Sequence, residues 1–169
     1  SNRPQPSYRP AVAQSLMQDG MDSGVTRAFE SSLQNLRAAG AHIEEIPLTE
    51  LLDIAPMMAT GGFSPAESYA WHRDLLAQHA DQYDPRVAQR IMRGSHMAAH
   101  DYIHLLQARV DWIGRMEKRL QCFDAVLSPT TPITAPLLST VAPGAERDAE
   151  FFRVNALLLR NPSAINTLD

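Results

Sequence analysis

Two short apolar segments flank one helical segment near the N-terminus, and this arrangement constrains the fold more than any other feature of the sequence. Residues 11–13 form one apolar run, and residues 42–46 form the other. Between them, apolar residues recur at helical spacing over residues 25–36, and Gly40 suits the left-handed turn that ends a helix. Strand, helix and strand in succession predict a βαβ unit over residues 11–48, whose right-handed crossover makes the two strands parallel.

The remainder of the chain is predicted to be mainly helical. Residues 49–122 form a helical region, in which the longest helix runs from about Ser95 to Gln121. A third short strand is expected over residues 123–127, followed by a Pro-rich loop and a last short helix over residues 146–160. The apolar stripe expected on the longest helix consists of Tyr102, Leu106, Val110, Ile113, Met116 and Leu120. The fold class is therefore α/β, helix-rich, with a βαβ unit and a third short strand.

Three short strands make a poor sheet, because both of its edges need neighbours. We therefore expect residues 11–169 to be one incomplete domain, with residues 123–169 as its strand, Pro-rich loop and terminal helix. Ser1 and Asn2 resemble a cloning remnant, so residues 1–10 are expected to be a tag remnant and an extended lead-in.

Charge and cysteine content exclude several classes of function. The chain has 15 basic and 19 acidic residues and a formal net charge of −4, so we expect no nucleic-acid partner. No apolar run has the length of a membrane span, and no membrane partner is expected. Cys122 is the only cysteine, which excludes an internal disulfide and zinc sites with several thiolates. We expect a reducing, cytoplasmic setting, and an apolar neighbourhood is expected to make Cys122 inert.

Three histidines, His96, His100 and His104, recur every four residues in the expected long helix. This spacing can place two imidazoles on one metal ion. The first and third would lie about 12 Å apart along the axis, at about 1.5 Å per residue, too far to share an ion. We expect a solvated face and no metal site.

The sequence shows no assembled catalytic machinery. Ser128 follows the third expected strand, but no Gly-x-Ser-x-Gly elbow surrounds it, and we expect a turn hydroxyl. Lys118 is the only lysine, so a mechanism that needs a catalytic lysine has one candidate. The arginines after Asp84 are expected to form a solvated face, and the glycines show no phosphate-binding pattern, so no cofactor is expected.

Five segments occur together in one order that is typical of a single enzyme family. They are residues 24–48, residues 83–94, Asp101 and Tyr102 with Arg109, residues 124–136, and Asn155 with residues 161–166. In the fourth of these, an aspartate and an apolar strand precede a Pro-Thr-x-Pro turn. Together they resemble the C-terminal portion of amidase signature enzymes. The resemblance implies that the chain is part of a larger mixed-sheet amidase fold.

The resemblance also implies a function. Amidase signature enzymes hydrolyse carboxylic amides with a serine nucleophile, a second serine on a cis peptide and a lysine base, all in a Gly- and Ser-rich N-terminal half. This chain has no such signature, and Lys118 has no serine near it in sequence, so no catalytic residue is carried over. We expect a C-terminal fragment of an amidase-signature amidohydrolase, inactive by itself. Its expected partners are the missing N-terminal catalytic half and, in the intact parent, a small-molecule amide. The isolated fragment is expected to self-associate.

Segments equivalent to those of Tyr69, Thr131 and Asn155 approach the active site in this family, which makes these residues the substrate-pocket candidates. Ordinary packing or turn hydrogen bonding is the alternative role for each. A free-standing amidase is preferred over an amidotransferase component, because residues 70–74 read Ala-Trp-His-Arg-Asp where such components show Ala-Arg-Tyr-Asp-Gly. The alternative to both is a self-standing helical binding or interaction module without enzymatic activity.

Overall fold

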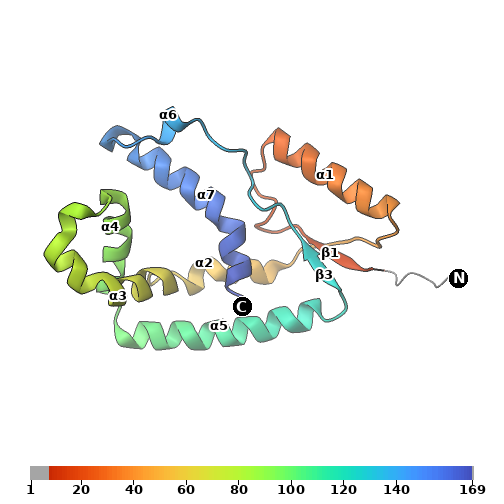
Figure 1. The fold of residues 1–169 in the computed structure, drawn as a ribbon. Coiled ribbons are helices and arrows are strands. Elements are labelled where there is room, and N and C mark those ends of the chain that lie inside the picture. The colour runs from red at the N-terminus through yellow and green to blue at the C-terminus, as the bar shows by residue number, and fades with distance from the viewer. Residues whose placement is uncertain (1–7, 169) are drawn as a thin grey trace, which may run out of the picture. The chain divides into compact units, whose positions relative to one another are not determined.

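The computed structural model describes residues 8–168, which form two compact units (Figure 1). The first unit combines the chain up to Leu52 with the chain from Arg115 onward, and the second is Asp53–Gly114. The prediction of a tag remnant and lead-in falls mostly on residues 1–7, outside the described residues.

A small parallel sheet forms the centre of the first unit. Its strands are β1 (Pro10–Ala13), β2 (Glu44–Ile46) and β3 (Ala125–Leu127), in the order β2-β1-β3. Ala11 is the register partner of both Glu44 and Val126, and both pairings are parallel. The central strand is completely buried, which explains why it reads as a continuous apolar run. The predicted βαβ unit and third strand are confirmed.

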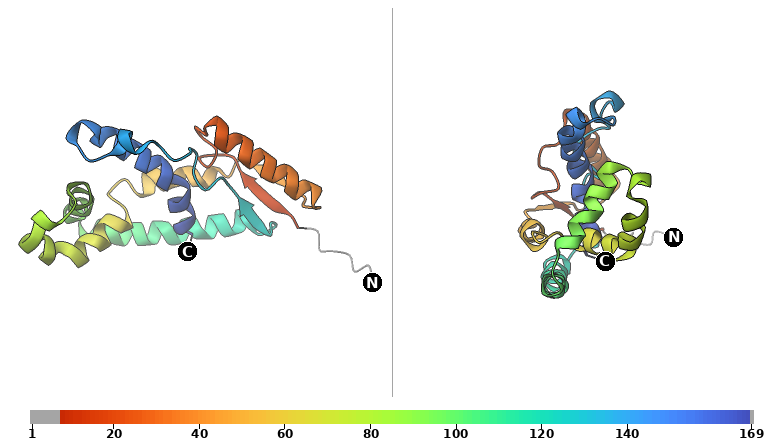
Figure 2. Two further views of the ribbon diagram at one scale, coloured as in Figure 1. Left: turned by 45° about the horizontal axis from the view of Figure 1, so that its top comes forward. Right: turned by 90° about the vertical axis from the view of Figure 1, so that its left-hand side faces the viewer.

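Helix α1 (Ser23–Ala38) is the crossover of the βαβ unit and lies alongside the strands in the views of Figures 1 and 2. Asp22 caps its first turn, because its carboxylate accepts a hydrogen bond of 2.8 Å from the backbone N–H of Val25. Leu33 is the buried residue of the helix. The chain leaves it through Gly40, whose φ of 96° lies in the left-handed region, as the sequence predicts.

The remaining elements of the first unit include a terminal helix longer than predicted. They are a 3-10 turn η1 (Thr49–Asp53), the short helix α6 (Leu138–Val141), a 3-10 turn η4 (Ala145–Arg147) and α7 (Asp148–Asn166). The sequence prediction ended the last helix at residue 160, and this was wrong because α7 continues through Pro162. A proline removes one helical hydrogen bond, and the buried face of Val154, Asn161 and Ala164 holds the helix together across that point.

The second unit is helical. It contains α2 (Ile54–Met57), α3 (Phe63–His79), η2 (Ala80–Gln82), α4 (Pro85–Met92), η3 (Arg93–His96) and the start of α5 (Ala99–Leu120). A close approach between α3 and η3 requires Gly94, since a Cβ atom there would lie 2.0 Å from the carbonyl oxygen of Pro65. The predicted start of the long helix at Ser95 was wrong, because the backbone is extended at Met97, with φ −77° and ψ 123°.

The predicted apolar stripe of α5 is wrong in part. Val110 is 66% exposed and Leu106 is 43% exposed, whereas Leu105, Trp112 and Met116 are 1–2% exposed. Apolar residues occupy neighbouring faces of this helix, so periodicity identifies a helix but leaves the buried face to tertiary packing. Among the described residues, no helix is long and apolar enough to cross a membrane.

Candidate functional site

The segments that follow the three strands meet at one edge of the sheet, because parallel strands end on the same side. Residues 14–20 follow β1, residues 47–48 follow β2 and residues 128–132 follow β3. The first two stay paired beyond the strands, where the backbone N–H of Ser15 donates to the carbonyl of Pro47 at 3.0 Å. Ligand sites of open α/β sheets form at the carboxyl ends of strands, so this carboxyl edge is the candidate site.

Two leucines at the carboxyl edge have a left-handed backbone. Leu16, after β1, has a φ of 64°, and Leu48, after β2, has a φ of 47°. This conformation costs a residue with a side chain about 1–3 kcal/mol and persists where surrounding contacts determine the backbone. Leu48 is 1% exposed, so tertiary packing holds this part of the carboxyl edge in place.

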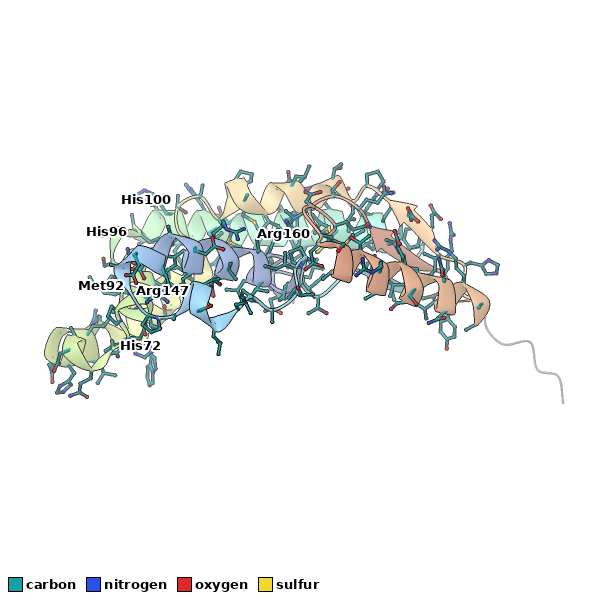
Figure 3. All side chains as sticks on the ribbon, turned by 90° about the horizontal axis from the view of Figure 1, so that it is seen from above. His72, Met92, His96, His100, Arg147 and Arg160 are labelled. Atoms are coloured by element: carbon teal, nitrogen blue, oxygen red, sulfur yellow. The ribbon has the colours of Figure 1, made fainter. Side chains whose placement is uncertain are left out.

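Asn161 joins two of the segments at the carboxyl edge. Its side chain is 1% exposed, and its Nδ2 donates at 2.8 Å to the carbonyl of Met17 and at 2.8 Å to the carbonyl of Pro129. Its Oδ1 accepts from Nε of Arg160 at 3.2 Å, and the same guanidinium donates to the carbonyl of Asp19 at 2.7 Å. Figure 3 labels Arg160 on α7. The C-terminal part of α7 therefore fixes the segment after β1 relative to the segment after β3.

Asp22 fixes the Pro-rich loop to the start of α1. The carboxylate accepts from the backbone N–H of Thr134 at 2.6 Å and from its hydroxyl at 2.9 Å, while the backbone N–H of Asp22 donates to Pro132 at 2.9 Å. The backbone N–H of Thr134, then that of Val25, then the Thr134 hydroxyl lower the pKa of Asp22 from 3.8 to about 2. The carboxylate therefore stays ionised and keeps these bonds across the neutral range.

An apolar groove of about 440 Å³ lies between α1 and the end of β3. We call it the α1 groove, and its α1 side is mainly apolar while its other side carries the hydroxyl side chains that follow β3. Its lining residues are Val25, Ala28, Phe29, Ser32, Leu33, Leu36, Leu127, Ser128, Pro129, Thr130 and Thr131. The groove offers an apolar surface next to a short polar segment, and it contains no assembled acid–base pair.

The three predicted pocket residues lie in different settings. Thr131 lines the α1 groove, where its hydroxyl donates to the carbonyl of Ile133 at 3.0 Å. Asn155 is half-buried on α7. Tyr69 belongs to the second unit and lines a groove of about 470 Å³ there. In that groove the hydroxyl of Tyr102 donates to Glu67 at 2.8 Å, and this bond raises the pKa of Tyr102 above its usual value. A role for any of the three in substrate binding stays a prediction.

Two other expectations about reactive or charged side chains were wrong. Cys122 is exposed, because it lies in the turn between α5 and β3 and not in an apolar neighbourhood. Arg86 is 9% exposed, so it does not belong to a solvated face. Arg90 is half-buried, and with Arg93 it lines a groove of about 380 Å³ between α3 and α4. The α4 cap is Asp84, which accepts from the backbone N–H of Arg86 at 2.9 Å.

Sequence reasoning placed Asn161 in a family motif but gave it no structural role. An asparagine followed by proline near the end of a helix normally indicates a helix end. Burial distinguishes Asn161 from an ordinary asparagine at a helix end, because a buried carboxamide must find hydrogen-bond partners. The burial of Asn161 depends on its contacts with segments 32 and 144 residues away in sequence. It therefore cannot be predicted from the residues next to Asn161.

Comparison with known proteins identifies the family. The sequence model of the amidase family matches residues 3–164. The chain belongs to the amidase family. Among solved structures, this amidase chain is similar in fold to a Kluyveromyces lactis allophanate hydrolase, at 22% identity and a TM-score of 0.81. That match covers 96% of this chain and 25% of the hydrolase chain. A crystal structure of an amidase has a TM-score of 0.67 at 22% identity, covering 92% of this chain and 36% of the other.

A curated relative is a component of the glutamyl-tRNA(Gln) amidotransferase of Symbiobacterium thermophilum, which is 28% identical over 149 residues. The match covers 75% of this amidase chain and 30% of the relative. The chain therefore spans about a third of the length of the curated relatives it matches. The predicted family and fold class are confirmed, and the described chain is similar in fold to a part of each of these longer solved chains.

Proposed function

We propose that this chain is the C-terminal part of an amide hydrolase and that it holds no complete catalytic apparatus by itself. Its membership of the amidase family supports hydrolysis of a carboxylic amide by the parent protein. In the reaction that the family resemblance implies, a serine is acylated, ammonia or an amine leaves, and water hydrolyses the acyl-enzyme. No metal ion or organic cofactor is required for these steps.

The setting of Lys118 is the observation that carries this proposal. A lysine base must lie within hydrogen-bond reach of the serine whose proton it takes. Lys118 is exposed on α5, and within the described residues it makes no hydrogen bond with a serine hydroxyl. It is also the only lysine of the 169 residues. Residues 8–168 thus lack the lysine–serine pair that the family's mechanism needs.

Amide hydrolysis by the purified 169-residue chain tests this proposal. Ammonia release from aliphatic and aromatic primary amides should equal that of the heat-denatured chain. Ammonia release that disappears in Lys118→Ala or Ser128→Ala would overturn the proposal. Glu117→Ala, which changes an exposed neighbour of Lys118 on the same helix, is the matched control.

The partner of this chain is proposed to be the N-terminal catalytic half of the same fold. Two features of the first unit support this. Strand β3 pairs with β1 on one side only, and the α1 groove lies next to its carboxyl end. An open strand edge and an adjacent apolar groove favour association, so we propose that the isolated chain self-associates through them.

Light scattering over a dilution series tests the partner proposal. The isolated chain should show an apparent mass that falls towards 18.7 kDa on dilution. A monomer at every concentration would instead support a self-standing binding module, which needs no further half to cover its sheet edge.

The proposed substrate is a small-molecule amide and not the amide of glutamine in an amidotransferase. The curated relatives are amidotransferase components, but residues 70–74 differ from the pattern of such proteins. Where that pattern has arginine, this chain has Trp71, which is 78% exposed and cannot form the bidentate bonds of a guanidinium with a carboxylate. Preference of the parent enzyme for glutamine over aromatic amides in an ammonia-release assay would contradict this substrate class.

A further inference from the structure

Two histidines share one exposed face at the start of α5 in the second unit. His100 and His104 lie one helical turn apart, and their ring centroids are separated by 6.4 Å with an interplanar angle of 71°. Both side chains are exposed, that of His100 by 75%. His96, which the sequence grouped with them, ends the separate turn η3, and the extended backbone at Met97 separates this turn from α5. Figure 3 labels His96 and His100. The helical pair therefore consists of His100 and His104.

The ring nitrogens of this pair are available to a ligand. Nε2 of His100 lies 3.7 Å from Oδ1 of Asp101, a contact that is weak because of its length and exposure. Apart from this contact and the contact between the rings, neither imidazole has a hydrogen-bond partner among residues 8–168. The Asp101 carboxylate adds a negative charge beside the pair, which favours a cation.

Imidazoles at positions i and i+4 of a helix can bind one metal ion together. Neutral imidazole nitrogen suits Zn²⁺, Ni²⁺ and Cu²⁺, at metal–nitrogen distances of about 2.0–2.1 Å for zinc. Exposed side chains change rotamer easily, so the two rings can turn from their present separation towards one ion.

We propose that His100 and His104 chelate one divalent transition-metal ion, with water in the remaining coordination positions. Within the described part of the chain, no group of three or more His, Cys, Asp or Glu residues could hold a metal. The site is therefore an exchangeable surface site, because structural zinc sites use four protein ligands and catalytic ones three. It is separate from amide hydrolysis, which needs no metal in the proposed mechanism.

Isothermal titration of the tag-free chain with NiCl₂ at pH 7.5 in a non-coordinating buffer tests the proposal. Every variant carries Cys122→Ser, because the exposed thiol of Cys122 is itself a metal ligand. Saturable binding of one ion per chain is expected. His100→Asn and His104→Asn should each weaken binding by about tenfold or more, because each leaves a single imidazole.

The matched control is His96→Asn, which changes an exposed histidine four residues away and should leave the dissociation constant unchanged. Circular dichroism of each variant checks that α5 is intact. Three results would overturn the assignment: no saturable binding, binding retained in the His100→Asn/His104→Asn double variant, or an equal loss in His96→Asn.

Discussion

Replacing Asn161 with alanine removes the hydrogen bonds that join α7 to the carbonyls of Met17 and Pro129, each 2.8 Å long. Met17 is 0% exposed and Asn161 is 1% exposed, so water cannot reach this position without a rearrangement. A buried acceptor left without its donor costs about 1–3 kcal/mol. Two such carbonyls give an expected loss of about 2–6 kcal/mol in the free energy of unfolding of the first unit.

Urea denaturation followed by circular dichroism measures this loss. Asn166→Ala is the matched control, because Asn166 is exposed in the last turn of the same helix, and a surface change of this kind stays within about 0.5 kcal/mol. Equal unfolding midpoints for Asn161→Ala and Asn166→Ala would refute the role given to Asn161. A loss above about 1 kcal/mol for Asn161→Ala alone would support it.

Three further predictions follow from local geometry. The wild-type chain should be more stable to unfolding than Asp22→Asn, by an amount that is constant above about pH 4 and that shrinks as the pH falls towards 2. The reason is that the pKa of Asp22 is about 2 in the folded chain, whereas its ordinary value is 3.8. Gly94→Ala should destabilise the second unit by about 1–3 kcal/mol or more, because the new Cβ meets the Pro65 carbonyl oxygen at 2.0 Å. Cys122 should react with a thiol reagent in the folded chain as fast as in the unfolded one, because it is exposed.

Each of these predictions has a reference or a result that would contradict it. For the acid titration, the difference in the free energy of unfolding between the wild-type chain and Asp22→Asn at pH 5 is the internal reference. A difference that stays constant from pH 4 to pH 2 would contradict the lowered pKa of Asp22. For Gly94→Ala, the control is Gly114→Ala within α5, where the new Cβ has no atom within 4 Å. This control should stabilise the folded chain by up to about 1 kcal/mol. Equal effects of the two substitutions on the free energy of unfolding would contradict the steric argument. Protection of Cys122 in the folded chain would contradict its exposure.

The sequence was sufficient for those elements whose signals are local. The βαβ unit follows from two apolar runs, the helical spacing of apolar residues between them and Gly40, and these signals lie within or next to the elements they specify. The buried face of α5 could not be predicted in the same way, because Leu105 and Leu106 are equally apolar and only packing buries the first. The continuation of α7 past Pro162 has a similar cause, since its buried face is fixed by distant segments.

The candidate site was predicted less completely than the fold. Thr131 follows β3 and lines the α1 groove, and its position after a strand can be read from a local Pro-Thr-x-Pro pattern, whereas its role in substrate binding stays a prediction. The left-handed backbone of Leu16 and Leu48 has no such pattern, since neither is a glycine or an asparagine. The two strained leucines and the buried Asn161 together define the carboxyl edge, and they come from separate segments of the chain.

The central proposal is that this amidase-family chain holds no activated catalytic serine of its own. The most direct test is incubation of the 169-residue chain with a fluorophosphonate, which modifies activated serines, followed by intact mass measurement. The mass of the chain is expected to stay unmodified after prolonged incubation. A stoichiometric mass increase that maps to a serine of this chain, and that is lost in Lys118→Ala, would contradict it.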